Sequence, residues 1–160
     1  MAQAATDCVA VSEIPPTECE ALVALYNSTD GANWSNNTGW NVTNTPCSWY
    51  GVSCGGGHVT RLSLYYNRLS GSIPSELGNL SHLGYLSLRD NQLSGPIPTE
   101  LGNLSNLRYL NLAYNQLSGS IPTELGNLSN LTYLDLYYNE LSGSILSELG
   151  NLSYLEWLSL

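Results

Sequence analysis

Leucine and polar residues alternate in a pattern that recurs every 24 residues over most of the chain. The pattern starts near Val59 and returns at Leu83, Leu107, Leu131 and Leu155. Its skeleton is L-x-x-L-x-L-x-x-N-x-L-S-G-x-I-P-x-E-L-G-N-L-S-x. The strict alternation in L-x-L predicts a short strand with leucine on a buried face. A fixed period of this length predicts a solenoid, because one coil cannot bury its leucines alone and neighbouring coils must cover them.

Other residues of the unit predict where each coil bends. A Ser-Gly pair supplies one bend, an Ile-Pro segment runs extended, and Glu-Leu-Gly-Asn turns the chain back. An asparagine ends each strand, where its amide can satisfy backbone groups that the turn leaves unpaired. Stacked coil on coil, these side chains should form a ladder of Asn67, Asn91, Asn115 and Asn139. The expected fold class is α/β: a right-handed solenoid with a parallel sheet on its concave face and a helical cap at its N-terminus.

Residues 1–58 do not repeat, and we interpret them as a capping region for the repeats in residues 59–160, which comprise four full units and a truncated fifth. A Thr-x-x-Glu capping box at Thr17 predicts a helix from about residue 18 to about residue 27. The last unit stops within a predicted strand, which leaves an apolar edge open. We therefore expect that the native chain continues or that this edge pairs with a second copy.

Three tryptophans follow the predicted helix within a Gly-, Asn- and Thr-rich loop. Trp34, Trp40 and Trp49 fall within 16 residues of one another, a density that could form a platform for a sugar. In a capping region, tryptophans more often cover the leucines that the first coil would expose. We favour the second interpretation.

All four cysteines precede residue 55, and their even number allows three disulfide pairings. We favour Cys8 with Cys19 and Cys47 with Cys54, because each pair is local and brackets a turn-rich segment. A metal site is disfavoured, since the short C-x-x-C spacings of zinc sites are missing. Disulfides place a protein outside a reducing cytosol, so we expect a secreted protein located extracellularly or at a cell surface.

The charge balance excludes some classes of partner. The chain has 13 acidic residues, four arginines and no lysine, for a formal net charge of -9. Binding of nucleic acid or of an anionic membrane surface requires clustered cations, so both are disfavoured. No apolar stretch reaches the roughly 18 residues that span a bilayer, and no pattern indicates a cofactor.

Catalytic residues do not converge in the pattern either. His58 and His82 each stand alone in the sequence, whereas catalysis requires a nucleophile, a base and an orienting group together. Asp90 and Asp135 both project from the predicted sheet, but they lie two units apart, roughly 9 to 10 Å by strand spacing. No apolar pocket is predicted that would raise the pKa of one of them. We expect that the protein is not an enzyme.

Several segments resemble one known family. SGSIPSELGNL (70–80), SGPIPTELGNL (94–104) and SGSIPTELGNL (118–128) are similar to the plant-type leucine-rich repeat, whose mark is L-S-G-x-I-P. CSWYGVSC (47–54) resembles the family's N-terminal cap, in which a cysteine pair surrounds a Trp and a Gly-Val; ALVALYNSTDGANW (21–34) is similar to caps of secreted or cell-surface members. The resemblance implies a leucine-rich-repeat solenoid of the kind found in receptor-like ectodomains and polygalacturonase inhibitors.

The concave face is where we expect a protein, peptide or glycan partner. Side chains that alternate with buried leucines should point into solvent, and eight of the eleven tyrosines fall on this face. Tyrosine gives large contact area with few rotatable bonds, as in antibody paratopes. The candidate contact residues are Arg61, Tyr65, Tyr66, Tyr85, Arg89, Asp90, Tyr109, Asn111, Tyr114, Tyr133, Asp135, Tyr137, Tyr138 and Trp157.

Two alternatives to this interpretation remain open. Repeat duplication could have copied the tyrosines, which would then stabilise the sheet by cross-strand contact. On the opposite side, a hydroxyl column followed by a glutamate column could contact ice or a glycan, or bind calcium. The hydroxyl column is Ser75, Thr99, Thr123 and Ser147, and the glutamate column is Glu76, Glu100, Glu124 and Glu148.

Overall fold

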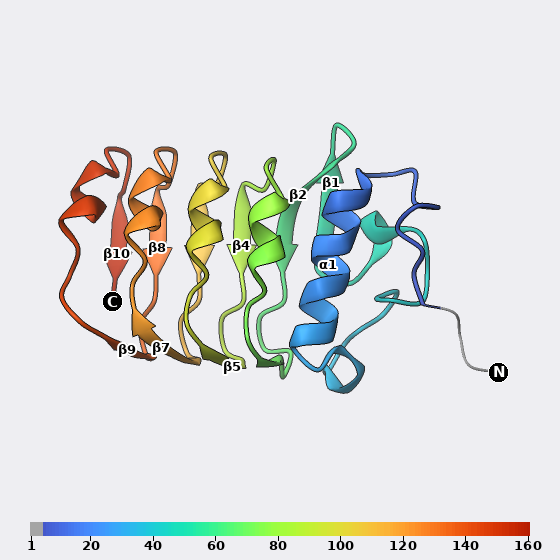
Figure 1. Ribbon diagram of the computed structural model, residues 1–160, viewed down its shortest axis with the longest axis horizontal. Helices are drawn as coiled ribbons and strands as arrows, with labels where there is room; N and C mark the ends of the chain where they lie inside the picture. Colours follow the sequence, from blue (N-terminus) through green and yellow to red (C-terminus); the bar gives the residue numbers. More distant parts are fainter. Residues whose placement is uncertain (1–4) are drawn as a thin grey trace.

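The computed structural model describes residues 5–160 as a row of stacked coils with a helical cap at one end. Figure 1 shows the strands side by side along the long axis, with the helix α1 (Pro16–Ser28) beside β2 near the N-terminal end. Residues 1–4 of the expected capping region lie outside the described residues. The right-handed α/β solenoid expected from the repeat pattern is confirmed.

The main sheet has six strands in the order β1-β2-β4-β6-β8-β10, and it forms the concave face. Strand β1 pairs antiparallel with β2, and every later neighbour is parallel and in register at the repeat length, so that Leu62 lies opposite Leu86 and Leu86 opposite Leu110. Each repeat position therefore stacks on its equivalents in neighbouring coils. The strands are β1 (Val52–Gly55), β2 (His58–Ser63), β4 (Tyr85–Ser87), β6 (Tyr109–Asn111), β8 (Tyr133–Asp135) and β10 (Trp157–Ser159).

A second sheet lies where the sequence predicted only a bend. Its four parallel strands are β3 (Ser70–Gly71), β5 (Gln92–Gly95), β7 (Gln116–Ser120) and β9 (Glu140–Ser142). Their Ser-Gly segments have no hydrophobic alternation of their own. They pair because identical extended segments of stacked coils lie within one strand spacing of each other.

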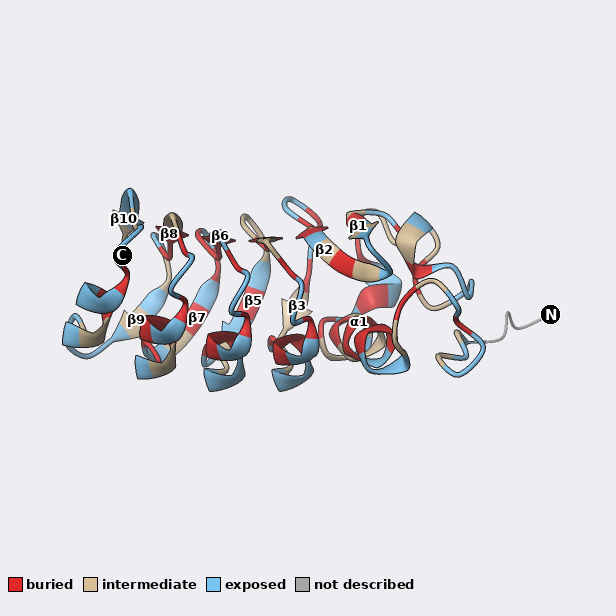
Figure 2. Cartoon of the chain, turned by 90° about the horizontal axis from the view of Figure 1, so that it is seen from above, coloured by how far each residue is buried: buried red, intermediate tan, exposed pale blue. Residues whose placement is uncertain are grey.

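Each coil returns through a short 3-10 helix over the Glu-Leu-Gly-Asn segment. These helices are η3 (Ser75–Asn79), η4 (Thr99–Asn103), η5 (Thr123–Asn127) and η6 (Ser147–Asn151). Figure 2 shows their buried positions turned toward the interior and their exposed positions turned outward. The helices stack closely: a Cβ added at Gly102 would lie 2.5 Å from the backbone oxygen of Glu124. Only glycine fits that approach.

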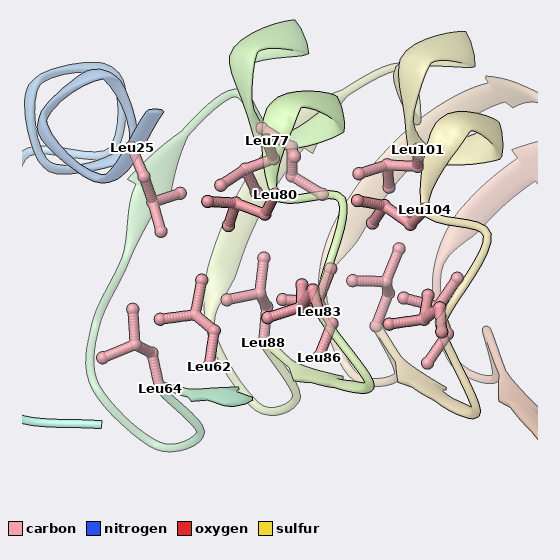
Figure 3. Packing of buried hydrophobic residues seen from close by; sticks show 14 of the residues in the cluster. Leu25, Leu62, Leu64, Leu77, Leu80, Leu83, Leu86, Leu88, Leu101 and Leu104 are labelled. Carbon is pink, nitrogen blue, oxygen red and sulfur yellow. The ribbon is translucent and has the colours of Figure 1, made fainter. Parts of the chain in front are cut away.

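The core is a column of leucines contributed by both sides of each coil. Leu62 and Leu86 from the main sheet and Leu77 and Leu101 from the 3-10 helices are fully buried. Figure 3 shows them facing one another across the coil, with Leu25 of α1 in the same layer at the N-terminal end. The cap thus covers leucines that the first coil would otherwise expose to water.

The predicted asparagine ladder is present at Asn91, Asn115 and Asn139, whereas the Asn67 amide bonds to the cap: its Nδ2 donates to Asn36 O and its Oδ1 accepts the Asn36 N–H. Asn115 Nδ2 donates to the backbone oxygens of Leu88 and Leu112, each at 3.0 Å, and its Oδ1 accepts the Leu93 N–H at 3.0 Å. Asn91 and Asn139 make the equivalent bonds in the adjoining coils. Each amide therefore joins two coils and satisfies backbone groups that the bend leaves unpaired.

The cap helix starts differently from the prediction. Its N-cap residue is Pro15, which makes no side-chain capping hydrogen bond, and Pro16 occupies the first turn. The predicted capping box at Thr17 is wrong, because proline at the first helical position fixes the helical φ and starts the helix two residues earlier. Short 3-10 helices η1 (Gly31–Asn33) and η2 (Pro46–Ser48) follow.

Three tryptophans and two disulfides hold the cap together. Trp34, Trp40 and Trp49 are buried, and the Trp40 ring lies 4.9 Å from Trp34 and 5.0 Å from Trp49 between centroids. This burial supports the lid interpretation over the sugar platform. The disulfides join Cys8 to Cys19 and Cys47 to Cys54, the favoured pairing.

Candidate functional site: a tyrosine-rich concave face

One side chain from each parallel strand of the main sheet contributes to a continuous stack, here called the ring column: Arg61, Tyr85, Tyr109, Tyr133 and Trp157. The Arg61 guanidinium carbon lies 3.5 Å from the Tyr85 ring centroid. Centroid distances along the column are then 4.3, 4.4 and 5.9 Å, with planes within 10° of parallel. The in-register pairing of equivalent repeat positions produces this stack. Its tyrosines are half-buried and its two ends are exposed.

Beneath the ring column lie two polar residues that the sequence placed in solvent. Asn111 is 1% exposed and Asp135 is 8% exposed. Asn111 Nδ2 donates to the Tyr109 hydroxyl at 3.2 Å, and the Tyr133 hydroxyl donates to Asp135 Oδ2 at 3.2 Å. The prediction that these side chains point into solvent is wrong, because the neighbouring phenols lean over them and bond to them. Asn111 and Asp135 position the rings.

Two phenols of the ring column, Tyr85 and Tyr133, have raised pKa values. Burial raises the pKa of Tyr133 to about 12, with a further contribution from the negative charge of Asp135. Burial also raises the pKa of Tyr85, helped by the neighbouring phenol of Tyr109. At neutral pH Tyr85 and Tyr133 therefore present uncharged rings with hydroxyl donors.

A second group, here called the exposed cluster, follows the ends of the strands: Arg89, Asp90, Tyr114, Tyr137 and Tyr138. Tyr137 and Tyr138 are 47% and 68% exposed. The Tyr114 ring lies 5.8 Å from Tyr137 and 5.2 Å from Tyr138 between centroids. Asp90, Tyr114 and Tyr138 have left-handed backbone, with φ of 54°, 56° and 56°. This backbone conformation is uncommon for residues other than glycine, and it changes the direction of the chain at the bend.

The charged pair at the edge of the exposed cluster lies next to an aromatic ring. Arg89 Nε donates to Asp90 Oδ2 at 2.7 Å, and the guanidinium carbon lies 5.0 Å from the Tyr114 ring centroid. The hydrogen bond to Asp90 raises the pKa of Arg89. The pair places one fixed positive and one fixed negative charge beside apolar rings.

The repeat position of Tyr65 carries tyrosine only in the first and fourth coils. Tyr65 and Tyr66 are 52% and 71% exposed. At the position of Tyr65 the next coil carries Arg89, the third carries the buried Ala113, and the fourth carries Tyr137. The face therefore has an aromatic pair at its N-terminal end and a larger cluster toward its C-terminal end.

Neither carboxylate of the concave face is arranged for catalysis. Asp90 accepts a hydrogen bond from Arg89. Asp135 is buried and accepts hydrogen bonds from Asn111 and Tyr133. Each carboxylate thus already has its own protein partners.

The hydroxyl and glutamate columns of the opposite side bond to each other. Each hydroxyl of Ser75, Thr99, Thr123 and Ser147 contacts the carboxylate of the following glutamate at 3.1 to 3.3 Å. Within residues 5–160 these glutamates do not form a group of three close enough to share an ion.

The structure brings together one cluster that sequence reasoning kept apart. Glu18, His58 and His82 place ligand atoms within 4.8 Å of one another, the only such group of three in residues 5–160. The statement that each histidine stands alone is wrong. Their separation of 24 residues was the available signal, because it places them at equivalent positions of adjacent coils.

Comparison with family models identifies the fold family. Models described as leucine rich repeat match residues 57–117 and, as two copies, residues 105–156; a leucine rich repeat N-terminal domain model matches residues 15–55. The chain belongs to the leucine-rich-repeat family. The resemblance to plant-type members is confirmed, and the leucine-rich-repeat ectodomains that it matches are binding modules without enzymatic activity.

Similar leucine-rich-repeat proteins come from plants. A probable leucine-rich repeat receptor-like protein kinase of Arabidopsis thaliana is 43% identical over 59 residues, 37% of this chain but only 8% of the kinase. The BIR2 ectodomain of the same species is 34% identical, with a TM-score of 0.80, 98% of this chain covered and 80% of that one. The plant peptide hormone receptor RGFR1, solved with RGF2, is 38% identical, with a TM-score of 0.58, over 68% of this chain and 20% of that one.

A plant ice-binding protein is 26% identical, with a TM-score of 0.56, over 91% of this chain and 58% of that one.

No helix within residues 5–160 has the length and apolarity needed to cross a membrane.

Proposed function

We propose that this leucine-rich-repeat chain is an extracellular recognition module that binds a protein or an extended peptide on its concave face. The observation that carries the proposal is the exposed cluster: three tyrosines and an oriented Arg89–Asp90 pair lie side by side at the bends that follow the strands of the main sheet. Interface hot spots are enriched in tyrosine and arginine. The similarity to RGFR1, a peptide hormone receptor by its description, supports the same class of ligand.

Three features of the concave face would favour binding of a ligand. The ring column is already stacked and hydrogen-bonded, so little side-chain freedom is lost when a ligand covers it. A hollow of about 290 Å³ lies beside the exposed cluster and can receive one ligand side chain; it is lined by Asn115, Gln116, Tyr138, Asn139 and Glu140. The Arg89–Asp90 pair would select the charge of the ligand.

The candidate contact residues take different parts in this proposal. Asn111 and Asp135 act from below by positioning phenols, because they are buried. The half-buried members of the ring column offer their edges. The exposed contacts are Arg61, Tyr65, Tyr66, Tyr114, Tyr137, Tyr138 and Trp157.

The test compares partner capture by matched tyrosine variants. The chain, a Tyr137→Ser, Tyr138→Ser variant and a Tyr154→Ser control are immobilised and exposed to extracellular fluid of the source organism. Tyr154 is 65% exposed but lies outside the concave columns. For a recovered partner, loss of both cluster tyrosines should weaken binding about 30-fold or more, as expected for hot-spot residues.

The control variant should bind that partner as tightly as the unaltered chain. Equal binding by all three chains would reject the exposed cluster as the binding site. Failure of each chain to retain any protein or peptide would reject the recognition function in this form.

The second candidate function is contact with ice or a glycan through the opposite face. The similarity to a plant ice-binding protein favours it. Against it, each hydroxyl of that column already contacts a glutamate. Inhibition of ice recrystallisation by the chain, lost on Thr99→Ala with Thr123→Ala and kept in the Tyr137→Ser, Tyr138→Ser variant, would establish this function instead.

We also propose that the protein is secreted or displayed at a cell surface. Two disulfides and the similarity to receptor ectodomains support this location.

A further inference from the structure

The only two histidines of the chain meet where the cap joins the first repeat. His58 begins β2, and His82 lies in the turn before β4. Their rings stack with centroids 3.6 Å apart and planes at 17°. Behind them lies Glu18 of α1, which is 2% exposed. Three elements that are distant in sequence thus place two imidazoles and one carboxylate together.

Glu18 fixes which nitrogen of His58 is free. Its Oε1 lies 2.7 Å from His58 Nδ1, and its Oε2 accepts the Val59 N–H at 2.8 Å. The carboxylate therefore holds the proton on Nδ1 and leaves the Nε2 lone pair of neutral His58 available. A carboxylate behind an imidazole is the arrangement that orients histidine ligands in metal sites.

The histidines depart from the role of this repeat position. In the next two coils the equivalent residues are Asn106 and Asn130, and each amide donates across to the preceding turn, to Ser81 O at 2.8 Å and Ser105 O at 2.7 Å. His82 makes no such cross-coil hydrogen bond in the described chain; its side chain has one hydrogen-bond partner, Ser81 Oγ at 3.2 Å, and it stacks on His58. The cross-coil hydrogen bond of this repeat position therefore does not account for histidine at residue 82.

We propose that His58 and His82 bind one divalent transition-metal ion, with zinc as the reference case, and that Glu18 is the positioning residue. Imidazole nitrogen suits zinc, copper and nickel, whereas calcium and magnesium prefer oxygen ligands. Thiolates are excluded, because all four cysteines are in disulfides. The net charge of -9 favours the approach of a cation.

The geometry requires only a local change. Two nitrogens about 2.0 to 2.1 Å from a tetrahedral zinc lie about 3.4 Å apart, and the two stacked imidazole rings have centroids 3.6 Å apart. The stacked rings must tilt so that both lone pairs point at one ion. His82 is exposed and can supply that rotation, while Glu18 keeps His58 in place. The bound ion would join the cap to the first repeat.

The direct test is calorimetric titration of chelator-treated protein with zinc chloride. We expect one zinc per chain and no binding of calcium. His82→Asn restores the residue of the equivalent repeat positions and should weaken zinc binding at least about tenfold while the chain stays folded. Glu100→Gln, on the opposite face, is the matched control and should leave zinc affinity unchanged.

Two further readouts separate a metal site from a structural clasp. Zinc at about 100 times its Kd should raise the Tm by about 5 to 10 °C in the unaltered chain but not in His82→Asn. The ring C–H resonances of both histidines should shift together at substoichiometric zinc. Glu18→Gln should lower zinc affinity and thereby show positioning of His58.

The proposal is overturned by any of three results. These are a flat zinc titration of the unaltered chain, equal zinc affinity in His82→Asn, or binding that disappears in Glu100→Gln instead. Because the metal experiment involves no concave tyrosine, its outcome is independent of the proposed recognition function.

Discussion

Removal of one amide from the asparagine ladder tests how the coils are held together. In Asn115→Ala the Leu93 N–H loses its acceptor, Leu88 O and Leu112 O each lose one donor, and a longer contact of 3.3 Å to Ala113 O is lost as well. The two carbonyls are not left unpaired: Leu88 O keeps its bond from Asn91, and Leu112 O keeps its bond from Asn139. The cost therefore falls mainly on one buried N–H.

The magnitude follows from this inventory. An unsatisfied buried donor costs about 1 to 3 kcal/mol, and each of the two lost carbonyl bonds contributes about 0.5 to 1.5 kcal/mol. These contributions sum to about 2 to 6 kcal/mol; partial relaxation of the bend keeps the total near the lower end, so we expect a loss of roughly 2 to 4 kcal/mol in the free energy of unfolding. For a chain of this size that corresponds to a fall in Tm of about 5 to 15 °C.

The assay is urea denaturation followed by circular dichroism, with Asn103→Ala as the matched control. Asn103 lies one coil earlier in η4, is exposed, and makes no side-chain hydrogen bond among the described residues. The control should lie within about 0.5 kcal/mol of the unaltered chain. If Asn115→Ala also costs less than about 1 kcal/mol, the ladder is a consequence of the fold and does not stabilise it.

Three other predictions test separate features of the molecule. Gly102→Ala should lower the Tm by several degrees, because its Cβ would lie 2.5 Å from the Glu124 backbone oxygen. Gly150→Ala, at the equivalent repeat position with nothing within 4 Å, should leave the Tm unchanged. Equal Tm values for the two variants would reject the close-approach argument. Ultraviolet titration should show one phenol of the folded chain ionising near pH 12, and this transition should be missing in Tyr133→Phe. Because the pKa of Tyr133 is raised above its unfolded value, its contribution to the stability of the folded chain is full below about pH 10 and is lost as the pH rises through 12. Reduction of the two disulfides, which close loops with sequence separations of 11 and 7, should cost about 2 to 3 kcal/mol each; an unchanged Tm under reducing conditions would contradict this.

The sequence predicted the fold because the information is repeated in it. The leucine spacing fixes the strand register, and the asparagine and glycine positions fix the bends, so each unit confirms the others. The second sheet was not predicted, since Ser94 and Gly95 carry no strand pattern and pair only through stacking of coils. The start of α1 was also missed, because a proline and a capping box compete within three residues and the sequence does not show which one prevails.

The concave face could be predicted only in part, and the reason lies in the size of its side chains. Alternation places residues 111 and 135 on the same face of the strand as Tyr109 and Tyr133. Alternation assigns each side chain to one face of the strand, but it does not say how far a ring extends over its neighbour. Here the phenols cover Asn111 and Asp135 and form hydrogen bonds with them. The same stacking of equivalent positions that hides these two residues brings His58 and His82 into contact. In a solenoid, therefore, a functional cluster is found by comparing residues one period apart, and its accessibility is decided by the larger side chain of each neighbouring pair.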